Sequence, residues 1–138
     1  MTVPSIQDAQ KNLIVILARE FASKLATSTF VADAAGTLVY FNEAAEALLG
    51  RSFAETGEVP LHEWAGLFEL EEDDGTAMPP ERRPGATVLR DHRPVHRDFS
   101  MTTFDGVKRR ISATAFPLFS HPGELAGIMS AFWERPGE

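Results

Sequence analysis

Apolar and polar side chains alternate along the last third of the chain, which predicts strands over residues 95–104, 107–118 and 125–134. Asp105-Gly106 is a tight-turn dipeptide between the first two strands, and His121-Pro122-Gly123 turns the chain into the third. Side chains two positions apart share a face of a strand, so the alternation assigns an inner face to the sheet. This predicted inner face consists of Phe99, Met101, Ile111, Ala113, Ala115, Ile128, Ser130 and Phe132.

Two shorter segments nearer the N-terminus predict a hairpin. Residues 29–32 and 37–41 are rich in β-branched and aromatic side chains, and the turn residues Asp33 and Gly36 lie between them.

Short helices are predicted to follow the hairpin. Asn42 can cap a helix over residues 43–49, and Gly50 can end it in a left-handed conformation. Residues 51–80 lose regular periodicity, which predicts short helical turns and a loop. Pro79 and Pro80 then open a predicted helix over residues 81–92.

Residues 5–25 predict a longer helix that is apolar nearly all the way round. Ile6, Leu13, Leu17, Phe21 and Leu25 share one face, and Ile14, Val15, Ile16 and Ala18 surround its middle. Such a helix needs two apolar partners. The sheet of its own domain would cover one side, near Phe116, Met129, Ala131 and Trp133, and the same helix of a second subunit the other. The predicted dimer interface is Leu13, Ile14, Leu17 and Phe21, and the alternative is a helix sunk into its own core.

Charge and composition argue against several classes of protein, including those that bind nucleic acids. The formal charge of −7 and pI near 5.1 argue against nucleic-acid binding, which draws on clustered Lys and Arg. The chain has no Cys, which excludes disulfides, thiolate metal sites and a nucleophilic Cys. Residues 1–10 lack the features of a signal peptide, and no apolar run is long enough to span a membrane. We therefore expect a soluble cytoplasmic protein.

Catalytic and metal motifs are missing from the sequence. It contains no Gly-rich phosphate loop, nucleophile elbow or His-Glu metal motif, so we expect no enzymatic activity. The acidic run over residues 71–74 lacks the ligand spacing of a calcium loop, and we expect a solvated loop and no metal site there.

Several motifs resemble those of PAS domains. Residues 30–45, followed by Leu48-Leu49-Gly50, resemble the opening of that family, where an Asp-x-x-Gly hairpin leads to a strand and an Asn that begins a helix. Met78-Pro79-Pro80-Glu81, Leu89-Arg90 and residues 115–118 and 127–134 match later segments, so that the likeness spans about residues 25–134. The resemblance implies an α+β fold with a five-stranded antiparallel sheet, short helices on one face and an extra N-terminal helix. It divides the chain into a helix over residues 1–25, a PAS domain over 26–135 and a tail over 136–138.

The resemblance also implies a cavity between the inner face and the helices. Small side chains in the cavity would leave space for a small, mostly apolar ligand, with Ser130 as a hydrogen-bonding group. The candidate lining is Phe30, Ala32, Trp64, Leu89, Phe99, Met101, Ile111, Ala113, Ala115, Ile128, Ser130 and Phe132. Trp64 and Leu89 could equally fill that space, so a closed core without a ligand stays open as an alternative.

The sequence offers few of the residues that hold flavin or haem in related sensors. The cysteine that forms a flavin adduct in the light-sensing branch of the family is missing. The haem-binding branch uses a His on the long helix, and His92 lies near the end of that helix, where a lone His more often stabilises the helix dipole.

The expected function is that of a bacterial-type, non-catalytic, homodimeric sensory domain with a kinase, phosphatase or transcription regulator as its output partner. The alternative is a structural dimerisation module with a filled core. Residues 133–136 replace the Asp-x-Thr motif that couples many PAS domains to an output helix, so signal would leave through the N-terminal helix, or the chain is a fragment of a longer sensor.

Overall fold

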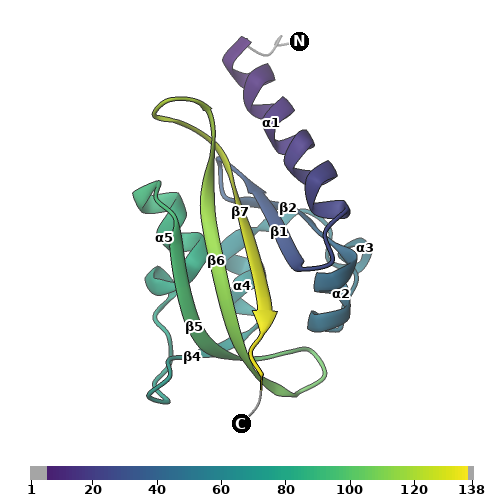
Figure 1. The fold of residues 1–138 in the computed structure, drawn as a ribbon, viewed down its shortest axis with the longest axis vertical. Coiled ribbons are helices and arrows are strands. Elements are labelled where there is room, and N and C mark those ends of the chain that lie inside the picture. The colour runs from purple at the N-terminus through teal and green to yellow at the C-terminus, as the bar shows by residue number, and fades with distance from the viewer. Residues whose placement is uncertain (1–5, 137–138) are drawn as a thin grey trace.

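A curled antiparallel sheet forms the centre of the molecule (Figure 1). The structure is a computed structural model that describes residues 6–136. The sheet has seven strands in the order β3-β2-β1-β7-β6-β5-β4. They are β1 (Ser28–Asp33), β2 (Thr37–Phe41), β3 (Val59–Pro60), β4 (Glu69–Glu71), β5 (Val95–Thr102), β6 (Lys108–His121) and β7 (Glu124–Glu134).

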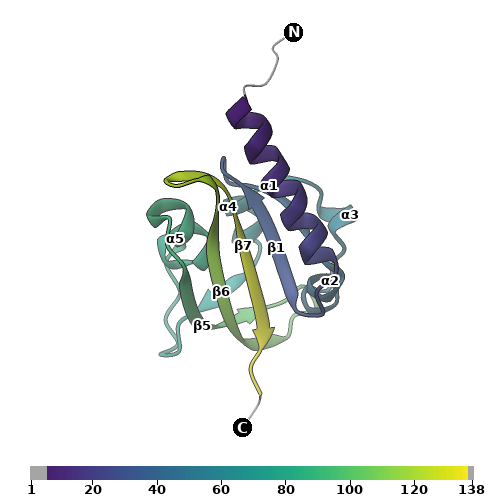
Figure 2. The ribbon, with the colours of Figure 1, turned by 45° about the horizontal axis from the view of Figure 1, so that its top comes forward.

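Helices cover both faces of this sheet (Figure 2). They are α1 (Ile6–Ser23), α2 (Glu43–Leu49), α3 (Phe53–Thr56), α4 (Leu61–Gly66), the 3-10 helix η1 (Pro80–Arg82) and α5 (Pro84–Asp91). Helix α1 crosses one face over β1 and β7, and α4 and α5 lie on the other. No described helix combines the length and the apolar character needed to cross a bilayer.

The predicted inner face of the last three strands is confirmed. Cross-strand neighbours within the predicted set include Phe99 with Ile111 and Ala113 with Phe132. All eight predicted side chains are buried. Because β6 is fourteen residues long, the alternation repeats often enough to leave one consistent assignment of faces.

The predicted count of five strands is wrong, because β3 and β4 add two edge strands in the segment that was expected to form turns and a loop. Both are very short. In β4, Leu70 is buried opposite Met101 while Glu69 on one side of it is exposed. A single alternation of this kind is too brief to predict a strand from sequence.

The single helix predicted over residues 81–92 is also wrong, because the structure has two shorter helices there. Pro84 restricts the residue before it, and Arg83 has extended backbone angles of φ −60° and ψ 138°. The chain therefore forms η1, breaks at Arg83 and restarts as α5 with Pro84 at the first helical position.

The helix caps predicted around α2 are confirmed. The Asn42 side chain accepts a hydrogen bond from the backbone N–H of Ala45, and Gly50 takes a left-handed conformation with φ 86°. The same side chain donates to the backbone oxygens of Ala22 and Thr27. Asn42 thereby ties the end of α1 to the start of α2.

Helix α1 has two apolar faces that differ in burial. Ala18 and Ala22 are buried against the sheet, together with Val31 and Met129. Leu13, Leu17 and Phe21 are 53%, 55% and 58% exposed. At 100° per residue the centres of these two sets lie about 120° apart around the helix. Ile14 is half-buried between them.

The docking surface expected for this helix is correct only in part. Met129 and Phe116 pack in the cluster beneath α1. Trp133 does not belong to this cluster: it is 41% exposed, and its ring centroid lies 6.1 Å from that of His96. Ala131 is half-buried and also lies outside the cluster.

Candidate functional site

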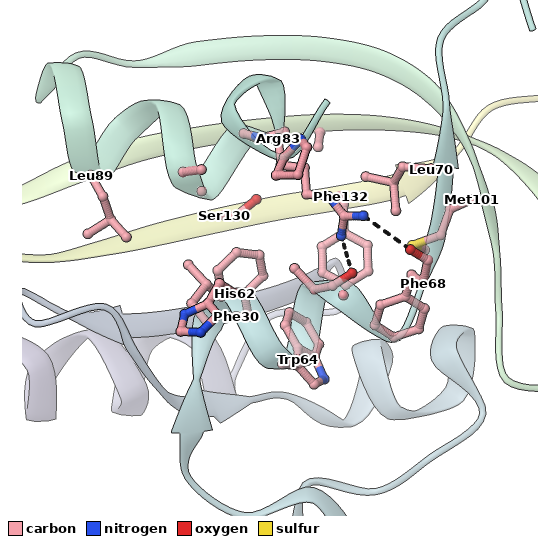
Figure 3. Close-up of a pocket in the computed structure, with 18 of the residues that line it drawn as sticks. Phe30, His62, Trp64, Phe68, Leu70, Arg83, Leu89, Met101, Ser130 and Phe132 are labelled. Carbon is pink, nitrogen blue, oxygen red and sulfur yellow. Dashed lines mark hydrogen bonds between the residues drawn. The ribbon is translucent and has the colours of Figure 1, made fainter. Parts of the chain in front are cut away.

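A cavity of about 340 Å³ lies between the inner face of the sheet and the segment that runs from α4 to α5 (Figure 3). Most of its lining is aliphatic or aromatic. Leu89 stands at one end, with Phe68 and Met101 at the other. The predicted candidates that line it are Phe30, Trp64, Leu89, Phe99, Met101, Ile111, Ala113, Ser130 and Phe132. This volume lies near the lower end of the range for small-molecule sites.

Ala32, Ala115 and Ile128 were predicted to line the cavity and do not. They are fully buried in the same core. Helix α5 explains the difference for Ile128, because Gly85 brings the helix backbone close to it. A Cβ atom placed on Gly85 would lie 3.5 Å from Cδ1 of Ile128 and 2.9 Å from Cδ2 of Leu61.

Sequence reasoning missed much of the remaining wall. The segment from α4 to α5 contributes Leu61, His62, Ala65, Gly66, Phe68, Leu70, Pro80, Arg83, Pro84, Gly85 and Ala86, and Ala35, Gly36 and Leu49 complete the lining. This segment has no long element, so periodicity could not assign its faces. The proline pair at Pro80 and Pro84 was the available signal, since it marks a break that turns Arg83 away from a continuous helix.

Aromatic contacts hold one wall of the cavity in place. The ring of Trp64 stacks on Phe41 with centroids 5.5 Å apart and meets the edge of Phe30 at 5.2 Å. Phe68 packs edge-on against Trp64 at 5.6 Å. Interlocked rings of this kind cannot rotate freely, and the wall they form is preorganised.

Few polar side chains reach the cavity. In the part of the chain that the structure describes, His62, Trp64, Arg83 and Ser130 are the lining residues with a polar nitrogen or oxygen in the side chain. Ser130 is buried on β7, whereas His62 is exposed at the rim. The Nε1 atom of Trp64 is buried and has no hydrogen-bond partner among the described residues.

Among the described residues that line the cavity, Arg83 alone carries a permanent charge. Its guanidinium donates to the backbone oxygens of Ala65 and Phe68, the second at 3.3 Å, and the dashed lines in Figure 3 mark these bonds. Its Nε is buried without a partner among residues 6–136. Burial lowers the pKa of Arg83 from its usual value.

A second polar cluster lies on the opposite side of the sheet. The hydroxyl of Ser112 donates to Asp98 at 2.7 Å, and His96 lies 3.1 Å from the same carboxylate oxygen. The bond from Ser112 is the main cause that lowers the pKa of Asp98. In a Ser-His-Asp triad the histidine lies between the other two, and here the carboxylate does. Because Ser112 is bonded to the carboxylate of Asp98 and not to His96, the histidine cannot act as a base for this serine.

The histidine considered for haem lies away from the cavity. His92 ends α5 in a left-handed conformation with φ 55° and is exposed. Among residues 6–136 no group of three or more His, Cys, Asp or Glu side chains is arranged to hold a metal ion.

The sequence profile of the PAS fold family matches residues 23–135, which is most of the chain. The chain belongs to the PAS family. PAS domains act as sensory domains in signalling proteins, and the curled antiparallel sheet with helices around a central cavity agrees with this assignment. Among curated proteins, none matches this PAS domain by sequence.

Solved PAS and LOV domains share the fold at low sequence identity. The PAS domain of Bordetella pertussis BvgS is 18% identical with a TM-score of 0.64, and the match covers 88% of this chain and 86% of that one. A PAS domain from Colwellia psychrerythraea is 14% identical with a TM-score of 0.61, covering 88% and 97%. The LOV domain of a blue-light activated histidine kinase from Erythrobacter litoralis is 17% identical with a TM-score of 0.62, covering 80% and 97%.

Proposed function

We propose that this PAS domain is a non-catalytic sensor that binds a small, mostly apolar molecule in the cavity and forms a homodimer through α1. The cavity carries the ligand part of the proposal. Protein interiors are packed as densely as organic crystals, and a closed core would not keep a space of about 340 Å³. At roughly 30 Å³ for each water-sized group, this space takes a ligand of about ten such groups.

Native mass spectrometry of freshly purified protein tests the ligand. We expect a retained mass in addition to that of the polypeptide. Ala113→Leu should reduce this occupancy, because Ala113 lines the cavity and is buried. Ala47→Leu is the matched control, since Ala47 is exposed on α2 and outside the cavity. A bare polypeptide mass that also fails to take up added apolar compounds would favour a structural module with a filled core.

The outward face of α1 supports the dimer. Leu13, Ile16, Leu17 and Phe21 are each more than half exposed along one side of the helix, and these four residues form the apolar stripe of α1. A group of large apolar side chains exposed on one side of a helix marks an interaction site. Burial of the stripe on two partners would remove on the order of 1,000 Å² from water, the lower limit for a specific interface.

Sedimentation tests this interface with one substitution. Leu17→Glu places a charge at the centre of the stripe and should shift the protein from dimer to monomer. Asn12→Glu adds the same charge at an exposed position of α1 outside the stripe and should leave the dimer intact. A dimer that persists in Leu17→Glu would remove this role from α1.

The output partner is a kinase, a phosphatase or a transcription regulator in this proposal. One similar structure is a LOV domain from a histidine kinase, and another is the PAS domain of nitrogen regulation protein NR(II) from Vibrio parahaemolyticus. Co-purification with a kinase or regulator from the source cells would support this assignment, and isolation of the domain as a free homodimer would weaken it.

A light response of the adduct type is not part of the proposal. The chain contains no cysteine, so a bond between a cysteine sulfur and flavin cannot form. Haem is also not proposed, because His92 lies outside the cavity.

A further inference from the structure

Arg83 places an uncompensated positive charge in an otherwise apolar cavity. No Asp or Glu is among the described residues that line it. The guanidinium has five N–H donors, and its two partners are the neutral backbone oxygens of Ala65 and Phe68. Its Nε is buried and has no partner among residues 6–136. Arg83 is half-buried, and a charge held partly out of water normally has a counter-ion, because transfer of an unpaired ion out of water is costly.

The neighbouring arginine shows what an ordinary pairing looks like in the same segment. Nε of Arg82 lies 2.7 Å from a carboxylate oxygen of Glu72 at the surface, and this contact raises the pKa of Arg82. For Arg83 the pKa is lowered by burial, and no acidic neighbour opposes that effect. The two adjacent arginines therefore differ in whether the protein supplies the anion.

The start of α5 adds to the positive potential at this place. Pro84, Gly85 and Ala86 form its first turn and line the cavity, and no side chain caps this end of the helix. The first turn of a helix carries a partial positive charge from its unpaired N–H groups. Arg83 immediately precedes this turn, so both features favour an anion in the same part of the cavity.

We infer that the ligand of this cavity is an amphipathic carboxylate of about ten water-sized groups in all, with its apolar body against the aromatic wall and its carboxylate against Arg83. This inference rests on the proposed sensory function and names its ligand class. Arg83 has five N–H donors and uses two for the Ala65 and Phe68 oxygens, so N–H groups remain that can bind a carboxylate. The carboxylate would thus complete the set of bonds at Arg83 and strengthen the connection between α4 and α5.

Calorimetric titration with octanoate and 1-octanol tests this inference. The two probes share an alkyl chain, and at pH 7 only octanoate carries a charge. We expect the wild-type protein to bind octanoate about ten-fold or more tightly than octanol, as a charge-assisted hydrogen bond implies. Arg83→Gln should reduce this preference to about two-fold or less, and Arg83→Lys should retain part of it.

Arg90→Gln is the matched control, because Arg90 is exposed on α5 and lies outside the cavity lining. It should keep the full preference for octanoate. Retained octanol binding by Arg83→Gln would show that this variant keeps its cavity, so that the ratio of the two affinities reports the anion contact alone.

The wild-type titrations separate the two proposals even where Arg83→Gln fails to fold. Equal affinities for octanoate and octanol would overturn the carboxylate inference and leave ligand binding in the cavity intact. Binding of neither probe would overturn both the carboxylate inference and the proposed ligand-binding function.

Discussion

Removal of the Asn42 side chain should be among the most damaging single substitutions in this domain. Asn42 is 1% exposed. Its Oδ1 accepts from the N–H groups of Thr29 and Ala45, each at 3.0 Å, and its Nδ2 donates to the oxygens of Ala22 and Thr27, each at 2.9 Å. One side chain therefore joins α1, β1 and α2.

The expected magnitude follows from these four bonds and from a fifth, longer bond of Nδ2 to the backbone oxygen of Leu25 at 3.3 Å. A buried hydrogen bond contributes about 1 kcal/mol net, and loss of a helix cap costs about the same. Asn42→Ala also leaves the N–H of Thr29 buried without a partner. We expect the free energy of unfolding to fall by about 4 kcal/mol, a large share of the roughly 5–15 kcal/mol that a domain has.

Urea unfolding followed by tryptophan fluorescence measures this loss. Trp64 is 5% exposed and stacked on Phe41, so its emission should report the core directly. Asn12→Ala is the control, because Asn12 is exposed on α1. Asn42→Asp keeps the acceptor oxygen but sets a carboxylate oxygen against the backbone oxygens of Ala22 and Thr27, so it should also lower the free energy of unfolding. A loss below about 1 kcal/mol for Asn42→Ala would refute the reasoning.

Two further substitutions and one titration test other parts of the fold. Gly127→Ala should lower the free energy of unfolding by about 3 kcal/mol in urea, as overpacking does, since its Cβ would lie 2.4 Å from the backbone oxygen of Ala32. Gly66→Ala, which meets no atom within 4 Å, should change it by less than about 0.5 kcal/mol. The pKa of Asp105 is lowered from 3.8 to about 2, chiefly by the hydroxyl of Thr103. Its stabilising effect is therefore present above pH 3.8 and is lost as the pH falls through about 2. An NMR midpoint near 4 for this carboxyl would contradict the assignment.

Long strands made the inner face predictable from sequence. The alternation is clearest in the middle of β6, where a shift of one position would put Arg110, Ser112 and Thr114 in the core. The caps at Asn42 and Gly50 were predictable for a different reason, because each depends on chemistry within a few residues of the chain.

The charged end of the cavity was not predictable in the same way. Pro84 marks a break at Arg83, but the sequence does not say that Arg82 pairs with Glu72 at the surface while Arg83 lies in the cavity. Their difference arises from the break before Pro84 and from the position of α4, which is a tertiary contact. Strands β3 and β4 were missed for the same reason, since two or three residues pair only where a neighbouring strand is already in place.

The central strands connect the cavity with α1 through adjacent residues. On β1, Phe30 lines the cavity while Val31 is buried beneath α1. On β7, Ser130 lines the cavity and Met129 packs beneath the helix. Because side chains of a strand share one stiff backbone, a ligand that moves Phe30 or Ser130 also moves the surface on which α1 rests.

Contacts at the opposite end of α1 hold it to the same unit. Lys11 lies 3.4 Å from Glu124 at the start of β7, and Gln10 contacts His121 at the end of β6. A ligand in the cavity and a partner on α1 would then both act on β7, which lines the cavity through Ser130 and contacts α1 through Met129 and Glu124. Coupling of two binding equilibria is reciprocal, so a ligand that strengthens the dimer must bind the dimer more tightly by the same factor. Equal affinity of octanoate for the wild-type dimer and for a Leu17→Glu monomer would show that these strands carry no signal between the two sites.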